Sequence, residues 1–178
     1  MLEGKECFHG SQRNILVDFG QNLTGLVEIR IRGEKGQKIT VRHAETLDQD
    51  GVFYPDTLRT AKSEDTYILN GEEQVLMPHF TFHGFRYAAV EGIENPRPEM
   101  FTACVMHSDM RKTGEFHCSN EKVNQLQSNI SWSLRDNFFD IPSDCPQRDE
   151  RLDRWEMRRY SRGQQRSTGR RLCFLQNG

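Results

Sequence analysis

The feature that most constrains the fold is a strict alternation of apolar and charged residues. Between residues 26 and 32, Val27, Ile29 and Ile31 take every second position, and charged residues follow each of them. Successive side chains of a strand point to opposite faces, so this segment has one apolar and one charged face. Such a pattern is typical of an antiparallel strand with one buried side. Residues 38–43 alternate in the same way after a turn at 33–36, and the two segments predict a β-hairpin.

Further short segments of this kind recur up to residue 108, separated by turn sequences such as Asn70-Gly71. The predicted strands are 15–17, 26–32, 38–43, 66–69, 75–78, 80–82, 85–90 and 101–106. Because no helical period intervenes, the chain is predicted to be mainly β, with an antiparallel β-sandwich over residues 14–110. Residues 1–13 are polar and unpatterned, and they are predicted to form a leader outside the sandwich.

The hydrophobic period changes after Ser119. Apolar residues then recur at spacings of three and four, which predicts an amphipathic helix over residues 120–138. We expect this helix to pack against the sandwich through its apolar stripe, which consists of Val123, Leu126, Ile130 and Leu134. Trp132 lies off the stripe, so the helix has a second apolar side that requires further helices to cover it.

Charge, hydropathy and cysteine content argue against several classes of function. The net charge of −2 gives no general basis for binding nucleic acid or a membrane surface, and no apolar run approaches the length of a membrane span. Five cysteines are odd in number, scattered and free of CxxC spacing, which argues against a zinc site and against a disulfide framework. Met1 is not followed by a signal-peptide pattern, and we expect a cytoplasmic protein that uses no cofactor.

Four histidines lie in or beside the predicted strands: His43, His79, His83 and His107. A metal cluster is conceivable, but no pair has a ligand-type spacing on one face with acidic residues nearby, so we predict structural roles and no metal. Four aromatic residues follow one another closely: Phe80, Phe82, Phe85 and Tyr87. They could form a platform for sugar stacking, but we expect them to be core residues.

The segment 144–151 gathers charged residues in a stiff turn. Its carboxylates and guanidinium groups are those of Asp144, Asp149, Glu150, Arg148 and Arg151. Pro142 and Pro146 restrict the backbone, because each fixes φ and removes a donor. Carboxylates accept hydrogen bonds from hydroxyls, and a neighbouring arginine tunes their pKa, so the segment suits a sugar or another polyol. Composition alone also allows a charged surface turn without a ligand.

Three motifs carry a resemblance to a known enzyme family. They are Asp-Phe-Gly-Gln-Asn-Leu-Thr-Gly at 18–25, Arg-His-Ala-Glu at 42–45 and Phe-Thr-Phe-His-Gly-Phe-Arg-Tyr at 80–87. Together they resemble the β-sandwich module of the bacterial α-L-rhamnosidases of glycoside hydrolase family 78. The resemblance implies a concanavalin-like sandwich.

The following residues extend the same resemblance. Residues 107–120 are similar to the junction that leads into the (α/α)6 barrel of that family, and Asp-Cys-Pro-Gln-Arg-Asp-Glu-Arg-Leu at 144–152 matches the motif that opens this catalytic barrel. The resemblance therefore implies that residues 111–152 are the start of a truncated barrel, including its first helix.

The resemblance also implies an enzyme that hydrolyses terminal α-L-rhamnose from glycosides with inversion. Such enzymes use one carboxylic acid to protonate the leaving oxygen and a second carboxylate to activate water. By motif position Glu150 is implied to be the general acid, and Asp144 and Arg148 to bind the rhamnose hydroxyls. Asp149 is implied to bind substrate as well, and its charge would raise the proton affinity of Glu150. The implied partner is a rhamnose-containing glycoside or oligosaccharide.

The chain departs from the family pattern after Leu152. Residues 153–178 are rich in arginine and almost without apolar period, where the family continues Leu-Gly-Trp-Thr-Gly-Asp and then a helix. A shift of the reading frame accounts for the tail. If suitable codons are chosen for residues 156–168 and translation begins one base earlier, the product is Gly-Asp-Ala-Gln-Val-Phe-Ala-Arg-Ala-Ala-Thr-Phe-Asn. This sequence resembles the missing helix. We therefore expect a frameshifted, truncated rhamnosidase whose aberrant tail does not dock on the folded part.

Three functional interpretations remain open from the sequence. The first is a rhamnosidase fragment that is inactive alone, because the catalytic base of the family lies much later in the barrel. The second is a non-catalytic carbohydrate-binding β-sandwich, which would bind rhamnosides without turnover. The third is a nucleic-acid binder with a basic tail, whose binding would weaken steeply with salt.

Overall fold

A computed structural model describes residues 1–9, 14–139 and 141–148. Its strands are β1 (Leu2–Glu3), β2 (Glu6–His9), β3 (Ile15–Arg32), β4 (Lys38–Ala44), β5 (Glu64–Ile68), β6 (Glu73–Leu76), β7 (His83–Glu91), β8 (Phe101–Val105), β9 (Phe138–Phe139) and β10 (Ile141–Pro142). Two short 3-10 helices, η1 (Asp56–Leu58) and η2 (Pro98–Met100), and one α-helix, α1 (Glu121–Asn137), complete the described part. The tail predicted not to dock, residues 153–178, lies outside it.

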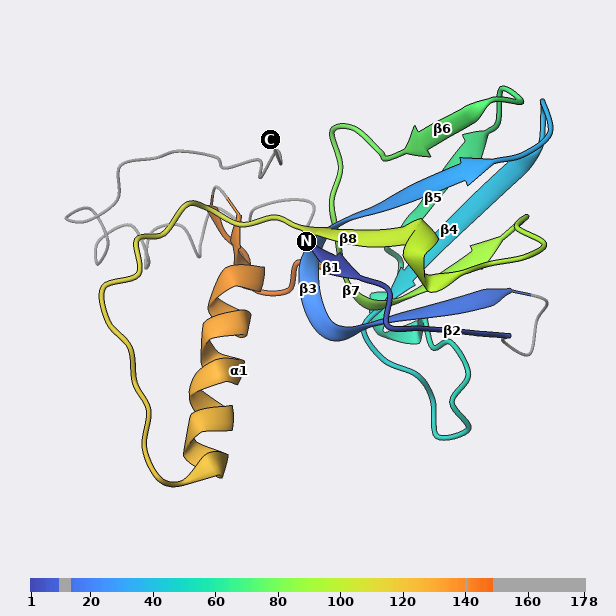
Figure 1. The fold of residues 1–178 in the computed structure, drawn as a ribbon. Coiled ribbons are helices and arrows are strands. Elements are labelled where there is room, and N and C mark those ends of the chain that lie inside the picture. The colour runs from blue at the N-terminus through green and yellow to red at the C-terminus, as the bar shows by residue number, and fades with distance from the viewer. Residues whose placement is uncertain (10–13, 140, 149–178) are drawn as a thin grey trace.

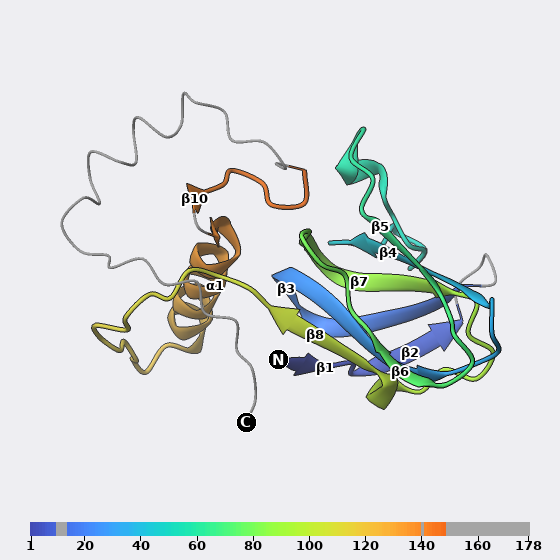
Figure 2. The ribbon, with the colours of Figure 1, turned by 90° about the horizontal axis from the view of Figure 1, so that it is seen from above.

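One long strand, β3, organises the sheet. The strand order is β1-β8-β3-β7-β4-β5, with β2 and β6 also paired to β3, and every pairing is antiparallel. Residues 15–18 of β3 pair with β2 and β7, whereas residues 25–32 pair with β8 and β6. The strand therefore takes part in two layers that face each other, and α1 lies beside them (Figures 1 and 2).

The bend that joins the two layers lies at Gly20. The pairing of β3 with β7 shifts register between Asp18 and Leu23, and Gly20 has φ +75°, which glycine adopts without steric cost. The Asp18 carboxylate accepts a hydrogen bond from the Gly20 amide at 2.6 Å and pairs with Arg86 at 2.8 Å. The Arg86 hydrogen bond and the Gly20 amide hold the pKa of Asp18 below its ordinary value, against the opposing effect of burial.

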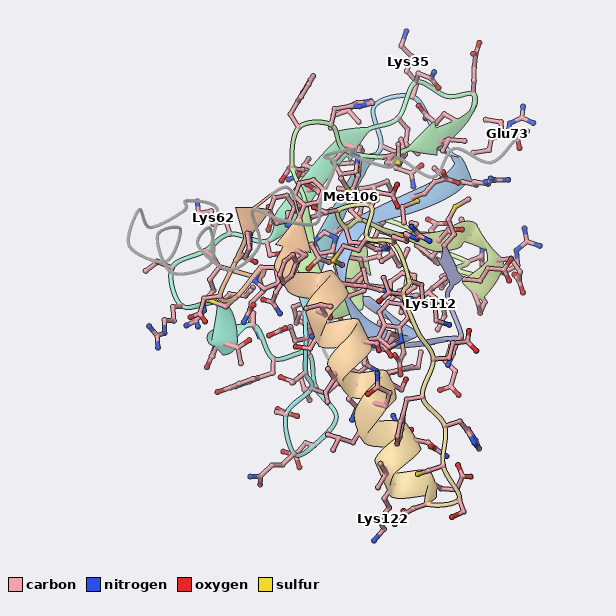
Figure 3. All side chains as sticks on the ribbon, turned by 90° about the vertical axis from the view of Figure 1, so that its left-hand side faces the viewer. Lys35, Lys62, Glu73, Met106, Lys112 and Lys122 are labelled. Atoms are coloured by element: carbon pink, nitrogen blue, oxygen red, sulfur yellow. The ribbon has the colours of Figure 1, made fainter. Side chains whose placement is uncertain are left out.

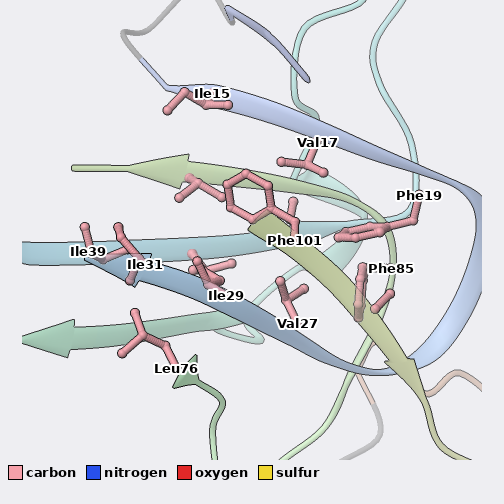
Figure 4. Close-up of a cluster of buried hydrophobic side chains, with 14 of the residues drawn as sticks. Ile15, Val17, Phe19, Val27, Ile29, Ile31, Ile39, Leu76, Phe85 and Phe101 are labelled. Atoms are coloured by element: carbon pink, nitrogen blue, oxygen red, sulfur yellow. The ribbon is translucent and has the colours of Figure 1, made fainter. Parts of the chain in front are cut away.

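The core fills the space between the layers (Figure 4). Val27, Ile29 and Ile31 are buried, so the prediction from their alternation is confirmed. Phe19 and Phe85 meet edge to face with ring centroids 5.6 Å apart, and Phe101 is fully buried in the same cluster. Burial of these side chains is the main source of stability of the sandwich. The predicted class, a mainly β antiparallel sandwich followed by one helix, is confirmed.

Two parts of the sandwich differ from the sequence prediction. Residues 2–3 and 6–9 form β1 and β2 within the sheet, so the polar leader expected over residues 1–13 does not describe them. The strand predicted at 80–82 is wrong, because β6 ends at Leu76 and β7 begins at His83. In the connection between them Phe80 has φ +62° and is fully exposed. Of the four aromatic residues expected in the core, Phe85 alone belongs to it. Phe80 and Phe82 precede β7, and Tyr87 lies on β7 outside the core cluster.

The predicted helix exists, but its packing is different. Asn120 caps α1 by accepting a hydrogen bond from the Lys122 amide at 3.1 Å. The apolar stripe predicted to face the sandwich is exposed, with Val123 at 38 %, Leu126 at 57 %, Ile130 at 53 % and Leu134 at 47 %. The helix meets β3 through Trp132 and Asp136 instead. Figure 3 views α1 from the side on which it stands away from the sheet, with Lys122 in its first turn.

Candidate functional site

A polar cleft of about 380 Å³ lies where three parts of the chain meet. One wall comes from the sandwich, at the bend of β3 and just after β4. The second comes from the last turns of α1. The third is the segment at 144–147, which passes over α1 towards the sheet (Figure 2). Segments far apart in the sequence therefore form one site.

The sandwich wall is built by three polar residues. The Asn22 Nδ2 donates to the Glu45 Oε1 at 2.9 Å, and the Gln21 Nε2 donates to the Asn22 carbonyl at 2.8 Å. The side-chain oxygen of Asn22 is buried and has no hydrogen-bond partner among the described residues. This wall thus places a carboxylate, held by the Asn22 amide, at the cleft.

The helix wall carries a buried carboxyl group. Asp136 accepts a hydrogen bond from the Thr24 amide at 3.3 Å, and the Thr24 hydroxyl donates to the Asp136 carbonyl at 2.7 Å. Burial raises the pKa of Asp136 to about 7, although the Thr24 hydrogen bond lowers it, and the Glu45 carboxylate raises it further. Asp136 therefore both ties α1 to β3 and titrates near neutrality. Trp132 lines the same wall, with the Arg135 guanidinium 5.1 Å from its ring centroid.

The third wall contains part of the motif that the sequence singled out. Asp144 lines the cleft, as expected of a sugar-binding carboxylate. A turn closed by the Arg148 amide and the Cys145 carbonyl (2.9 Å) brings the Arg148 Nη2 to 3.3 Å from the Cys145 sulfur. The backbone also touches β7 here, because a Cβ added to Gly84 would lie 2.8 Å from the Gln147 amide nitrogen. Arg148 does not line the cleft, and Asp149 and Glu150 lie outside the described residues.

A second cluster, in the sheet, joins His43, Asp65 and His83 from β4, β5 and β7. The sequence argument that no histidine pair has acidic company was wrong, because neighbouring strands bring distant residues together. The two imidazole rings stack with centroids 4.1 Å apart, and the His83 Nε2 lies 3.1 Å from the Asp65 carboxylate. Burial, then the neighbouring His83, lowers the pKa of His43 to about 3.

The potential ligand atoms of this cluster lie within 4.8 Å of one another. His43 Nδ1 lies 3.2 Å from the Ser63 carbonyl, so it carries the proton. Its buried Nε2 has no hydrogen-bond partner among the described residues, and the Asp65 carboxylate lies 3.9 Å from it. The rings are only 19° from parallel, so their nitrogen lone pairs run side by side and do not converge on one ion. This arrangement favours a hydrogen-bonded network that links three strands, and the absence of a metal stays a prediction.

Sequence reasoning missed most of the cleft. Asn22 and Glu45 stand inside the motifs at 18–25 and 42–45, so the family resemblance was a signal that these positions could be functional. Asp136 lies within the helix with no motif around it, and its role follows only from the fold.

Two family models match this chain. The bacterial alpha-L-rhamnosidase concanavalin-like domain matches residues 9–107, and the bacterial alpha-L-rhamnosidase 6 hairpin glycosidase domain matches residues 111–160. The chain belongs to the bacterial α-L-rhamnosidase family. The resemblance predicted from the motifs is thereby confirmed, and α1 belongs to the part that matches the hairpin glycosidase domain.

Curated relatives of this chain are α-L-rhamnosidases. An α-L-rhamnosidase of Formosa agariphila is 44 % identical over 156 residues, which cover 85 % of this chain and 17 % of the relative. An α-L-rhamnosidase of Streptomyces avermitilis is 45 % identical over 139 residues, covering 77 % of this chain and 14 % of the relative. The chain therefore spans about a sixth of the length of these rhamnosidases.

Solved structures agree with the fold. A crystal structure of Streptomyces avermitilis α-L-rhamnosidase complexed with L-rhamnose superposes with a TM-score of 0.81 at 41 % identity, over 85 % of this chain and 15 % of that one. An α-L-rhamnosidase from Aspergillus terreus gives 0.79 at 47 % identity, over 84 % and 18 %.

Proposed function

We propose that this chain forms the β-sandwich and the opening of the catalytic barrel of an inverting α-L-rhamnosidase, which removes terminal α-L-rhamnose from glycosides. Family membership and the names of the relatives support the substrate class. The observation that carries the proposal is that Asp144, from the motif at 144–152, lines a cleft rich in carboxylates and amides. These groups suit the hydroxyls of a sugar.

In the proposed mechanism Asp144 binds the rhamnose hydroxyls from the wall of the cleft. Motif position alone assigns the same sugar to Arg148, which does not line the cleft, and to Asp149. Glu150 protonates the glycosidic oxygen as the bond to the anomeric carbon breaks. A second carboxylate takes a proton from the water that attacks the opposite face, about 6.5–9.5 Å from the acid. We propose that this base comes from a barrel segment absent from the chain, so that the 178-residue chain alone hydrolyses no rhamnoside.

A chimera tests the proposal. Residues 1–152 are joined to the part of the Streptomyces avermitilis relative that follows its matching segment, and both this protein and the 178-residue chain are assayed with an aryl α-L-rhamnoside. We expect turnover by the chimera alone, with β-L-rhamnose as the first product by NMR. Glu150→Gln should lower kcat by about 10²–10⁴-fold, and Asp144→Asn should raise KM, whereas the matched surface change Glu94→Gln should alter neither.

Two results would contradict the proposal. Turnover by the 178-residue chain that disappears in Glu150→Gln would show that no further segment is needed. A folded chimera that binds rhamnosides and hydrolyses none would favour the second candidate, a carbohydrate-binding sandwich without catalysis, which the presence of the cleft in this short chain supports.

Other aspects of the function remain proposals. None of the helices in the described part of the chain combines the length and the apolar composition needed to cross a bilayer. The cytoplasmic location, and the lack of nucleic-acid and membrane partners, stay predictions from the sequence.

A further inference from the structure

The start of β7 approaches the segment at 144–147 more closely than a side chain would allow. Gly84 is buried, and a Cβ added to it would lie 2.8 Å from the Gln147 amide nitrogen and 3.0 Å from the Gln147 Cα. A Cβ atom essentially never comes closer than 3.0 Å to such a neighbour. The glycine is therefore what allows the two backbones to touch.

The conformation of β7 does not require a glycine at this position. Gly84 lies within the strand, pairs with Thr24 of β3 and has a φ outside the left-handed region. Glycine inside a strand is destabilising, and it often marks the close approach of another backbone. The contact with Gln147 therefore accounts for the glycine better than the strand does.

A second contact anchors the beginning of the same segment, just after α1. The Phe82 ring, two residues before Gly84, packs on the Phe139 ring with centroids 4.8 Å apart. The preceding Phe138 carbonyl accepts a hydrogen bond from the Ser108 amide at 2.6 Å. Phe82 is half-buried and outside the core cluster, so its ring serves this contact and not the core of the sandwich.

Asp144 lies between the two anchors in sequence and lines the cleft. Pro142 and Pro146 stand on either side of it, and each fixes φ of the backbone. A stiff segment moves as a unit, so a displacement of Gln147 by a side chain at position 84 would also displace Asp144.

We propose that Phe82 and Gly84 are positioning residues of the rhamnosidase, which clamp the segment after α1 on the sandwich and thereby set the place of Asp144 in the cleft. The inference rests on the proposed function and deepens it, because Glu150, the proposed acid, follows Gln147 by only three positions. The sandwich then contributes to the reaction through residues that do not touch the substrate.

Amide hydrogen exchange of the 178-residue chain, followed by NMR, tests the anchors directly. Gly84→Ala and Phe82→Ala should each speed exchange of the Ser108 amide by about tenfold, the loss expected of a contact such as one aromatic pair. Gly114→Ala is the matched control, because its Cβ would meet no described atom within 4 Å. Ala88→Gly, also in β7, should lower the midpoint of urea unfolding and leave the Ser108 amide unchanged.

The chimera with the Streptomyces avermitilis relative supplies the kinetic measurement. A misplacement of about 1 Å can lower a rate by about 10²-fold, so Gly84→Ala should lower kcat/KM by about this factor. Ala88→Gly should retain kcat/KM although it is less stable. Phe82→Tyr, which keeps the aromatic ring, should lose far less than Phe82→Ala, and this pair decides the question if Gly84→Ala does not fold.

Two results would overturn the inference. The first is an unchanged Ser108 exchange rate or an unchanged kcat/KM in Gly84→Ala. The second is an equal kinetic loss in Gly84→Ala and Ala88→Gly, since the loss would then follow stability and not position. An unsubstituted chimera without turnover would contradict the proposed function, and exchange of the Ser108 amide would still decide whether the anchors hold the segment.

Discussion

The sandwich buries its regularly spaced apolar residues, whereas α1 leaves its apolar stripe exposed. In the sandwich, alternating residues such as Val27 and Ile29 are 2 % and 0 % exposed. In α1 the regularly spaced Leu126 and Ile130 are more than half exposed, and contact with β3 is made by Trp132 and by the hydrogen bonds of Asp136. Regular spacing therefore identifies an apolar face in both regions, but a partner for that face is present in the described residues only for the sandwich.

The two regions also place buried titratable groups in different settings. His43, within the sandwich, is held neutral by burial, and its pKa is lowered to about 3. Asp136, at the junction with α1, has its pKa raised to about 7, chiefly by burial. Acidification must therefore charge a buried histidine in one region and neutralise a buried carboxylate in the other. We expect their stabilities to change in opposite directions with pH.

The largest expected effect is in the core. Phe85 is fully buried and contacts Phe19 and His43, so Phe85→Ala should lower the free energy of unfolding by about 3–5 kcal/mol. Phe80→Ala removes the same side chain from a fully exposed position and should change it by less than about 0.5 kcal/mol. Urea unfolding measures both, and similar losses would break the distinction between core and loop aromatics.

The next effect is acid destabilisation of the sandwich. In the unfolded chain His43 takes up a proton near pH 6.5, whereas in the folded chain it does so only near pH 3. The unfolded state therefore binds more protons between these values, and stability falls as the pH falls, by about 3 kcal/mol at about pH 4. His43→Gln, compared with wild type by urea unfolding across this range, should flatten the dependence. An unchanged slope in the variant would assign the pH dependence to other groups.

A smaller effect of opposite sign is expected at the junction with α1. The Asp136 carboxyl has an ordinary pKa of 3.8 and one of about 7 when folded, so the folded state binds more protons between these values. Docking of α1 should weaken as the pH rises through this window, by about 1–2 kcal/mol allowing for solvent screening. Hydrogen exchange of α1 amides measures the trend, which Asp136→Asn should abolish. Docking that strengthens with pH would contradict the assignment.

The smallest effect is expected on the exposed stripe of α1. Leu126→Gln and Leu134→Gln should each change the stability of this chain by less than about 0.5 kcal/mol. Trp132→Ala, on the side that contacts the core cluster, should cost about 2 kcal/mol through lost burial. Thermal unfolding compares the three variants. A large loss for either leucine would mean that the stripe is covered after all.

The sequence by itself determined most of the elements and the family. A period of two predicted the buried face of β3, and a period of three to four predicted a helix over 120–138, close to the observed Glu121–Asn137. Those patterns follow from local geometry, which links neighbouring positions in the chain. The motif at 144–152 identified the family and pointed to Asp144, which lines the cleft.

Only the tertiary structure decided which faces have partners and which residues share a site. Thr24 and Asp136, which join the helix to the sandwich, are 112 positions apart. Asn22, in β3, and Glu45, just after β4, form a hydrogen bond although they are 23 positions apart. The stacked pair His43 and His83 likewise depends on strand order. A periodic pattern shows that a face is apolar, but it contains no information on what covers that face. Contacts between distant segments, and the pKa shifts that burial causes, exist only once the chain has folded.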